Sequence, residues 1–204
     1  MAESPKRNAT YADLEAAPEH LVAEIINGEL LTHPQPSRRH IAATSSLGDE
    51  LVGPFQKGRG GPGGWVILDE PDVRIRDDFV MPDLAGWRRE RLTGHPESSY
   101  FVVVPDWICE VLSTSTEVRD RTSKKRIYAE AGVGFLWLID PRLQLLEAFE
   151  LRAGSWTDVG TWSSDEFVRA PPFDAISFSL ADLWPLDPPL GLNEDPTPYY
   201  AGDR

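Results

Sequence analysis

WICEVL (Trp107–Leu112) is a near-continuous apolar run that contains a single acid, Glu110. Apolar residues at successive positions predict a strand that is covered on both faces, as in the centre of an α/β sheet. FLWLI (Phe135–Ile139) has the same character, and a helix is expected between the two runs, over residues 120–131. The helix should end at one of the two glycines that follow it, Gly132 or Gly134.

The segments around this unit predict one mixed α/β domain, an α+β mixed sheet with helices on its faces. Further strands are expected at Val22–Ile26, Leu30–Thr32, Trp65–Leu68, Val73–Arg76, Phe79–Ala85, Leu143–Leu151 and Trp156–Thr161. Further helices are expected at Tyr11–Ala17 and from Ser37 to about Phe55, the second with Ile41, Leu47 and Leu51 toward the core. Asn27-Gly28 is a strong hairpin signal between the first two strands. The domain spans residues 10–183, between a disordered segment 1–9 and a proline-rich irregular tail 184–204.

The length and composition indicate a soluble globular chain. Its 204 residues suffice for one domain with a sizeable core, and 41% are hydrophobic. No apolar run reaches the length of a membrane span, and the N-terminus lacks a hydrophobic signal core, so we expect a cytoplasmic protein without a membrane partner. Cys109 is the only cysteine, which excludes an intramolecular disulfide and a multi-cysteine zinc site.

The net charge of −13 requires any nucleic-acid surface to be local. The run RDRTSKKR (residues 119–126) holds five Lys or Arg side chains and one Asp, and is the main candidate. A smaller group, Arg38, Arg39 and His40, precedes the long helix, and a third, residues 88–91, is expected to be a solvated surface.

Two single acids lie beside apolar segments, and a cluster of cations follows them. Glu110 shares a strand face with Ile108 and Leu112, because side chains alternate with a period of two. A buried carboxylate costs several kcal/mol unless a metal or a cation compensates it. Asp83 follows Pro82 and by itself suits a strand end or a turn. A divalent-metal site and a plain ion pair of Glu110 with Lys124 or its neighbour therefore both remain open.

Three stretches resemble the Uma-two family of restriction endonucleases, within the PD-(D/E)XK nuclease superfamily. They are EIINGEL (residues 24–30), MPDLAGW (81–87) and PDWICEVLSTSTEVRDRTSKKRIYAEAGVGFLWLIDP (105–141). The resemblance runs from about Thr10 to about Leu151 and more weakly to Leu183, and its most specific part lies between Glu110 and Pro141. It implies a restriction endonuclease-like core with a central mixed sheet flanked by helices.

The resemblance also implies a set of site residues. Asp83 corresponds to the aspartate of the PD motif, and Glu110 to the acid of the (D/E)XK element. Leu112 stands where the lysine of that element would be, and the matching family lysine is Lys124 on the following helix, with Lys125 as its adjacent alternative. The remaining implied residues are a supporting acid, Glu24; the carbonyl of Val111 as a metal ligand; His40, Lys125 and Arg121 as substrate contacts; and Asp120, which an N-cap role explains equally well.

Two functional classes follow from these residues. The first is a metal-dependent endonuclease that hydrolyses DNA phosphodiester bonds with Mg²⁺ or Mn²⁺, as a homodimer because cutting two strands needs two sites. The second is a catalytically inactive protein of the same fold that acts as a binding or interaction module, which the acidic net charge favours. The side chain of Lys124 discriminates between them: a lysine that points to solvent would weaken the first class.

Overall fold

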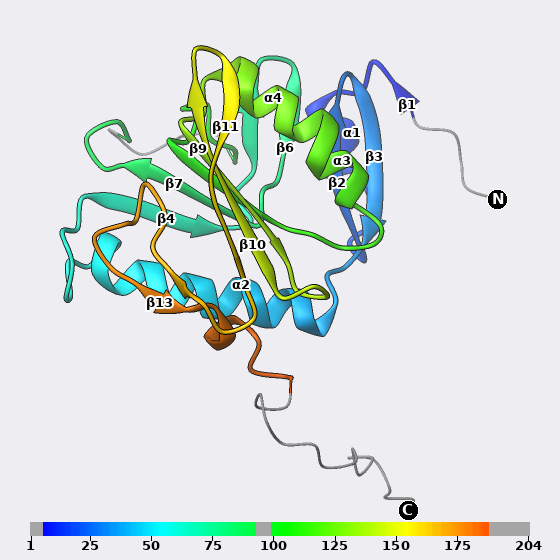
Figure 1. The fold of residues 1–204 in the computed structure, drawn as a ribbon. Helices are drawn as coiled ribbons and strands as arrows, with labels where there is room; N and C mark the ends of the chain where they lie inside the picture. The colour runs from blue at the N-terminus through cyan, green and yellow to red at the C-terminus, as the bar shows by residue number, and fades with distance from the viewer. Residues whose placement is uncertain (1–5, 93–98, 188–204) are drawn as a thin grey trace, which may run out of the picture.

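The computed structural model describes residues 6–92 and 99–187, and Figure 1 shows the arrangement of their elements. The helical elements are α1 (Tyr11–Glu15), α2 (Arg38–Leu51), η1 (Val52–Gln56), α3 (Glu117–Arg119), η2 (Asp120–Lys124), α4 (Lys125–Ala131) and η3 (Leu180–Leu183). The strands are β1 (Lys6–Arg7), β2 (Leu21–Ile26), β3 (Glu29–Pro34), β4 (Trp65–Asp69), β5 (Val73–Ile75), β6 (Asp78–Val80), β7 (Leu84–Arg88), β8 (Trp107–Val111), β9 (Phe135–Asp140), β10 (Leu145–Arg152), β11 (Ser155–Ser163), β12 (Phe167–Val168) and β13 (Phe178–Ser179).

A six-stranded mixed sheet in the order β11-β10-β9-β8-β7-β4 forms the centre of the fold. Only β8 and β9 are parallel in it, and the other neighbours are antiparallel. Parallel neighbours need a crossover connection, which α3, η2 and α4 provide. The predicted mixed sheet with a buried strand at Trp107–Val111 is therefore confirmed.

Each face of this sheet carries its own apolar core. Trp107, Cys109 and Val111 point into a core with α2, whereas Ile108 and Leu112 point into a core with α4. Figure 1 shows the two helices on opposite sides of the sheet. Because Glu110 alternates with Cys109 and Val111, its carboxylate lies on the face that α4 covers.

A five-stranded sheet, β1-β3-β2-β6-β5, stands beside the central one. Its β2–β3 hairpin turns at Asn27 and Gly28, whose φ angles of +53° and +74° suit a tight turn with two left-handed residues. The hairpin prediction is confirmed. Lys6–Arg7 pairs with β3, so these two residues of the segment expected to be disordered form a strand, while residues 1–5 lie outside the described part.

Several predicted boundaries of strands and helices were wrong. The strand expected over Phe79–Ala85 is two strands, β6 and β7, which belong to different sheets. Pro82 lies between them, and proline cannot donate a ladder hydrogen bond. The helix expected to Ala17 ends at Glu15, and the long helix changes to a π-helical turn at Val52.

The helix that connects β8 to β9 begins at Glu117 and contains the π-helical turn η2, which the sequence pattern did not indicate. Its predicted end is confirmed at Gly132, whose φ is +82°. Residues 93–98 of the predicted loop and residues 188–204 of the predicted tail lie outside the described part. Trp184 at the start of that tail is buried.

A side chain at Gly86 is expected to destabilise the core. A Cβ at this position of β7 would lie 3.1 Å from Cε3 of Trp107 and 3.3 Å from Cε3 of Trp65. Both rings are buried and pack against Phe173, with centroid distances of 4.9 Å, so neither can move aside cheaply. Gly86→Ala should lower the free energy of unfolding by about 1–3 kcal/mol in urea titrations.

A matched glycine serves as the control. A Cβ at Gly48 in α2 would meet no heavy atom within 4 Å outside the backbone of its own helix. Gly48→Ala should raise stability by up to about 1 kcal/mol, because alanine is the better helix former. Equal effects of the two substitutions would contradict the packing argument for Gly86.

Candidate nuclease site

Five segments that are distant in the sequence bring the site residues together. Asp83 lies in the turn between β6 and β7, Glu110 in β8, Lys124 at the end of η2 and His40 in the first turn of α2. Glu24 reaches the same place from β2. All five side chains line one cavity of about 220 Å³.

Lys124 points to the acids and is 3% exposed. Its Nζ lies 2.8 Å from Oε1 of Glu110, 2.9 Å from Oε1 of Glu24 and 3.7 Å from Oδ1 of Asp120. Lys124 has this direction because the crossover helix, formed by α3, η2 and α4, packs over the end of β8 and turns this side chain toward the sheet. The solvent-pointing alternative is thus wrong.

Glu110 is 2% exposed, and the protein engages both of its oxygens. Lys124 Nζ donates to Oε2 over 3.0 Å, and the hydroxyl of Tyr128 donates to Oε1. Tyr128 follows Lys124 by four residues, so the two side chains share one helix face. The spacing of four between Lys124 and Tyr128 is the sequence signal for the contact of Tyr128 with Glu110, although no role was predicted for this tyrosine.

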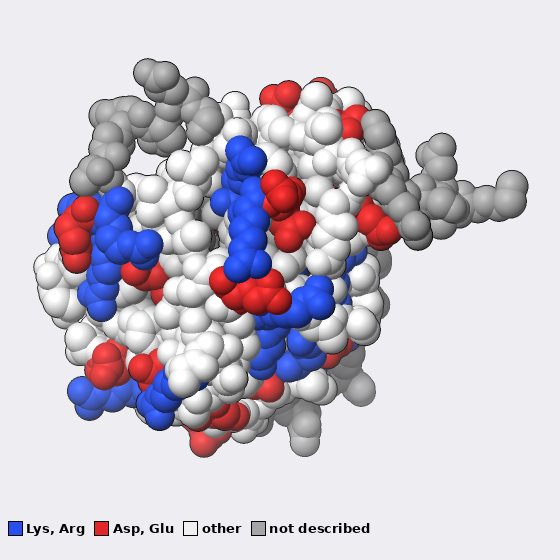
Figure 2. All heavy atoms as spheres, turned by 90° about the horizontal axis from the view of Figure 1, so that it is seen from above, with Lys and Arg blue, Asp and Glu red and all other residues white. Residues whose placement is uncertain are grey.

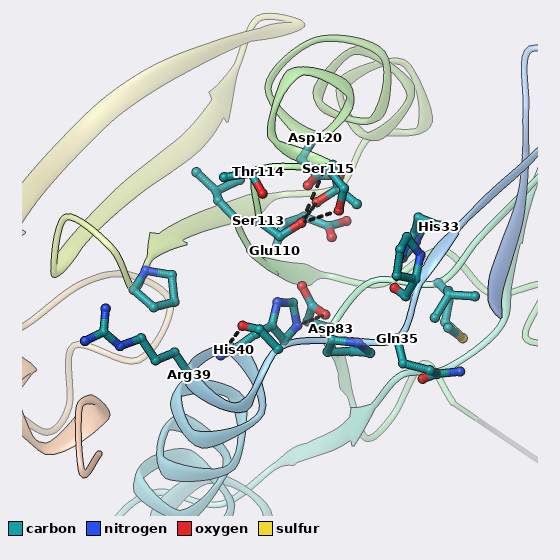
Figure 3. A pocket seen from close by; sticks show the side chains of 18 of the residues that line it. His33, Gln35, Arg39, His40, Asp83, Glu110, Ser113, Thr114, Ser115 and Asp120 are labelled. Atoms are coloured by element: carbon teal, nitrogen blue, oxygen red, sulfur yellow. Dashed lines mark hydrogen bonds and ion pairs between the residues drawn. The ribbon is translucent and has the colours of Figure 1, made fainter. Parts of the chain in front are cut away.

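Asp83 is held by a histidine and by the backbone. Its Oδ1 lies 2.6 Å from Nε2 of His40, and its Oδ2 accepts from the N–H of Val111 over 2.6 Å. In an extended strand the N–H and C=O of one residue project to the same side, so the carbonyl of Val111 faces the Asp83 side as well. Figure 3 shows His40, Asp83 and Glu110 lying near one another in the cavity.

His40 is buried, whereas Ile41 beside it is 53% exposed. The prediction that Ile41 faces the core was therefore wrong. The buried positions of α2 are His40, Ala43, Leu47 and Leu51, at intervals of three and four, so the apolar stripe continues into His40. Within the described residues, Nδ1 of His40 has no hydrogen-bond partner.

Arg119 is a further site residue that was not predicted from the sequence. Its guanidinium lies 3.2 Å from Oε2 of Glu24, whose other oxygen accepts from the N–H of Met81 over 3.0 Å. Asp120 lies inside the helix and is buried, so of its two alternative roles the N-cap role was wrong. Only the tertiary fold brings Arg119 against a strand almost a hundred positions earlier.

The electrostatics show a surplus of negative charge. Burial and the neighbouring carboxylates raise the pKa of Glu110 well above its usual range, against the charge of Lys124. Burial likewise raises the pKa of Asp120. Burial opposes the ionised form of Glu24, but Lys124 and Arg119 outweigh it and lower its pKa. The carboxylates hold the pKa of Lys124 well above its usual range despite its burial, so it stays charged.

His40 is also biased toward its charged form. Burial opposes the charge, but the hydrogen bond and the negative charge of Asp83 prevail and raise the pKa of the imidazole. Four carboxylates, Glu24, Asp83, Glu110 and Asp120, thus surround one lysine, one arginine and one histidine. A bound cation could neutralise the remaining negative charge of these carboxylates.

The donor chemistry suits a hard divalent cation. Asp83, Glu110 and the carbonyl of Val111 offer oxygen atoms, which Mg²⁺ and Mn²⁺ prefer. Each carboxylate has about four lone-pair sites, so it can keep its present partner and accept a cation as well. Across residues 6–92 and 99–187, however, no group of three or more His, Cys, Asp or Glu side chains is already arranged as a metal site.

Two predicted substrate contacts lie elsewhere. Lys125 Nζ lies 3.4 Å from the centroid of the Phe149 ring, and Arg121 pairs with Glu147 at 2.6 Å and with Glu117 at 3.2 Å. Neither side chain lines the cavity. The lysine next to Lys124 points the other way because adjacent helix residues face different directions.

A mixed sheet flanked by helices, with two acids and a lysine at one edge, is the arrangement of restriction endonuclease-like proteins. The chain belongs to the Uma2 family, described as "Putative restriction endonuclease", whose family model matches residues 9–181. Its fold is similar to the crystal structure of "a putative nuclease belonging to DUF820 from Anabaena variabilis ATCC 29413", with 21% identity and a TM-score of 0.69. That match covers 86% of this chain and 97% of the other. No curated protein matches the chain. Within the described residues, no helix is long and apolar enough to cross a membrane.

Proposed function

We propose that this protein is a metal-dependent endonuclease that hydrolyses DNA phosphodiester bonds. The observation that carries the proposal is the convergence of Asp83, Glu110 and Lys124 in one cavity of a restriction endonuclease-like fold. Membership of the Uma2 family supports the same class of reaction. The proposed cofactor is Mg²⁺ or Mn²⁺, and the proposed location is the cytoplasm.

The cavity residues have distinct proposed roles. Asp83, Glu110 and the carbonyl of Val111 would hold the cation, with Glu24 in support. A bound cation of this kind lowers the pKa of a water molecule and stabilises charge on a phosphoryl group. Lys124, which remains charged between the acids, neutralises charge that develops on the phosphate and orients the attacking water.

His40 has both a positioning role and a direct substrate contact in this scheme. Its Nε2 fixes one oxygen of Asp83, which leaves the other oxygen on the N–H of Val111. A contact with a phosphate would have to use Nδ1, which is buried and has no protein partner within the described residues, so the neighbouring side chains must shift before a phosphate oxygen can accept from it.

A specific observation favours a second candidate, a non-catalytic protein of the same fold. Lys124 and Tyr128 already engage both oxygens of Glu110, so the buried ion pair is structurally complete without a metal. The net charge of −13 also opposes a nucleic-acid partner. A binding or interaction module would need neither a cation nor a nucleophile in the cavity.

Titration calorimetry with Mn²⁺ separates the two candidates. The wild-type protein should bind Mn²⁺, and Glu110→Gln should weaken that binding by at least about tenfold, because the variant loses a charged oxygen ligand. Asp165→Asn, the same change of charge at an exposed position outside the cavity, should bind like wild type. A wild-type protein that releases no heat of Mn²⁺ binding would favour the non-catalytic module.

A further inference from the structure

We propose that the cavity accepts one unpaired DNA strand and excludes an intact duplex. This inference rests on the proposed function and names the substrate class of the same site. Three features carry it: the depth of the acids, the size of the cavity, and the way in which its cations are already used.

The reacting groups lie too deep for a duplex to reach. The side chains of Lys124, Glu110 and Glu24 are 2–3% exposed, and that of Asp83 is 15% exposed. A scissile phosphate must therefore enter the protein.

The cavity is also small. Its volume of about 220 Å³ is below the roughly 300–1,000 Å³ of pockets for drug-sized ligands. That space suits a phosphate with its adjoining sugars rather than two paired strands. One wall is the segment His33–Ser37 that joins β3 to α2, and the other is the loop Ser113–Thr116 after β8. In Figure 3 the labelled residues of these segments lie on different sides of Asp83.

The Lys and Arg side chains that line the cavity each have an acidic partner in the protein. Arg39 pairs with Asp187 at 2.7 Å, and Arg142 pairs at 2.6 Å with both Asp140 and Glu117. Lys124, the third lining Lys or Arg, is held by its acids. Duplex binding is dominated by contacts of Lys and Arg with many phosphates. Figure 2 shows the same interleaving on the face above α4, where acidic side chains border a row of basic ones.

Neutral donors replace these cations at the mouth. Ser113 Oγ lies 2.9 Å from Ser115 Oγ and 3.0 Å from Thr116 Oγ1, so the loop presents a group of hydroxyls beside the acids. Hydroxyls of Ser and Thr contact phosphate and sugar oxygens without net charge. A single strand, with fewer phosphates within reach, matches this weakly charged entrance better than a duplex does.

The inference is tested on the full chain with Mn²⁺ and two probes. One is a fluorescein-labelled thymidine homopolymer of about 16 nucleotides, which cannot pair with itself, and the other is its duplex with the complementary adenosine strand. The single strand should be cut at least about tenfold faster than the duplex. Cleavage of the duplex at an equal or higher rate would overturn the inference.

Binding to the same probes keeps the inference testable if neither is cut. Fluorescence anisotropy should then show tighter binding of the single strand, which would retain the inference while the proposed catalysis fails. Equal or tighter binding of the duplex, or binding of neither probe, would overturn it.

A blocking variant ties the selectivity to the cavity. Ser115→Tyr places a ring at the exposed mouth and should weaken single-strand binding by about tenfold. Ser155→Tyr, the same change at an exposed position of β11 outside the cavity, should bind like wild type. If the two variants bind the strand equally well, the strand does not enter this cavity and the inference is wrong.

Discussion

Asp83→Asn is expected to reduce metal-dependent DNA cleavage by at least about a hundredfold, a larger loss than that for residues which only orient a metal ligand. The physical reason is the loss of a charged oxygen at the proposed cation site. The fold should survive, because the amide oxygen can still accept from the N–H of Val111 while its NH₂ faces a neutral His40. Initial cleavage rates in Mn²⁺ measure the loss.

Two further variants of the protein serve as controls for this result. Asp165→Asn carries the same change of charge at an exposed position outside the cavity and should cleave like wild type. The double variant Asp83→Asn with Glu110→Gln should be inactive while it keeps the wild-type circular dichroism spectrum. Retained metal-dependent cleavage by a pure preparation of the double variant would refute the assignment of both acids.

Lys124→Met is expected to lower the free energy of unfolding by about 3–5 kcal/mol, because it leaves buried acids without their cation. Glu24 and Glu110 lose contacts of 2.9 Å and 2.8 Å with Nζ. Methionine keeps the length of the side chain, so the lost volume is small. Urea titrations at neutral pH measure the loss.

The loss should shrink as the pH falls. Lys124 helps to hold the pKa of Glu24 below its usual value and opposes the rise in the pKa of Glu110. Its removal therefore raises both folded-state pKa values, and the folded variant binds more protons than the folded wild-type protein. Relative to the wild type, the stability of the variant then decreases as the pH rises through those pKa values and recovers as it falls. Lys125→Met is the matched control, since it removes only a cation–π contact worth about 1 kcal/mol. A small loss that is independent of pH would mean that Lys124 neutralises no buried charge.

Much of the fold follows from local patterns. The apolar runs of β8 and β9, the Asn27-Gly28 turn and the helix stop at Gly132 each depend on residues within a few positions of one another. The break at Pro82 within residues 79–85 is also a local signal, but the assignment of its two strands to different sheets is not. Val80 and Leu84 are both buried and apolar, and only the pairing of β6 with β2 and of β7 with β8 assigns them to different sheets.

The candidate site divides in the same way. The sequence resemblance selects Asp83, Glu110, Lys124 and Glu24, and the structure gathers all four around one cavity. It also selects Lys125 and Arg121, which the structure directs to other partners. Residue type alone could not separate the lysines at 124 and 125, because that choice depends on which face of the helix packs on β8.

The sequence by itself determined which elements form and which residue types carry the chemistry, because periodicity, turns and caps act over a few residues. Only the tertiary structure decided which groups meet. It brought Arg119 to Glu24, His40 to Asp83 and Tyr128 to Glu110, since these pairs join elements that touch only after the sheets and the crossover helix have packed. The burial that follows from this packing also sets the pKa values, which depend on the distances between charges.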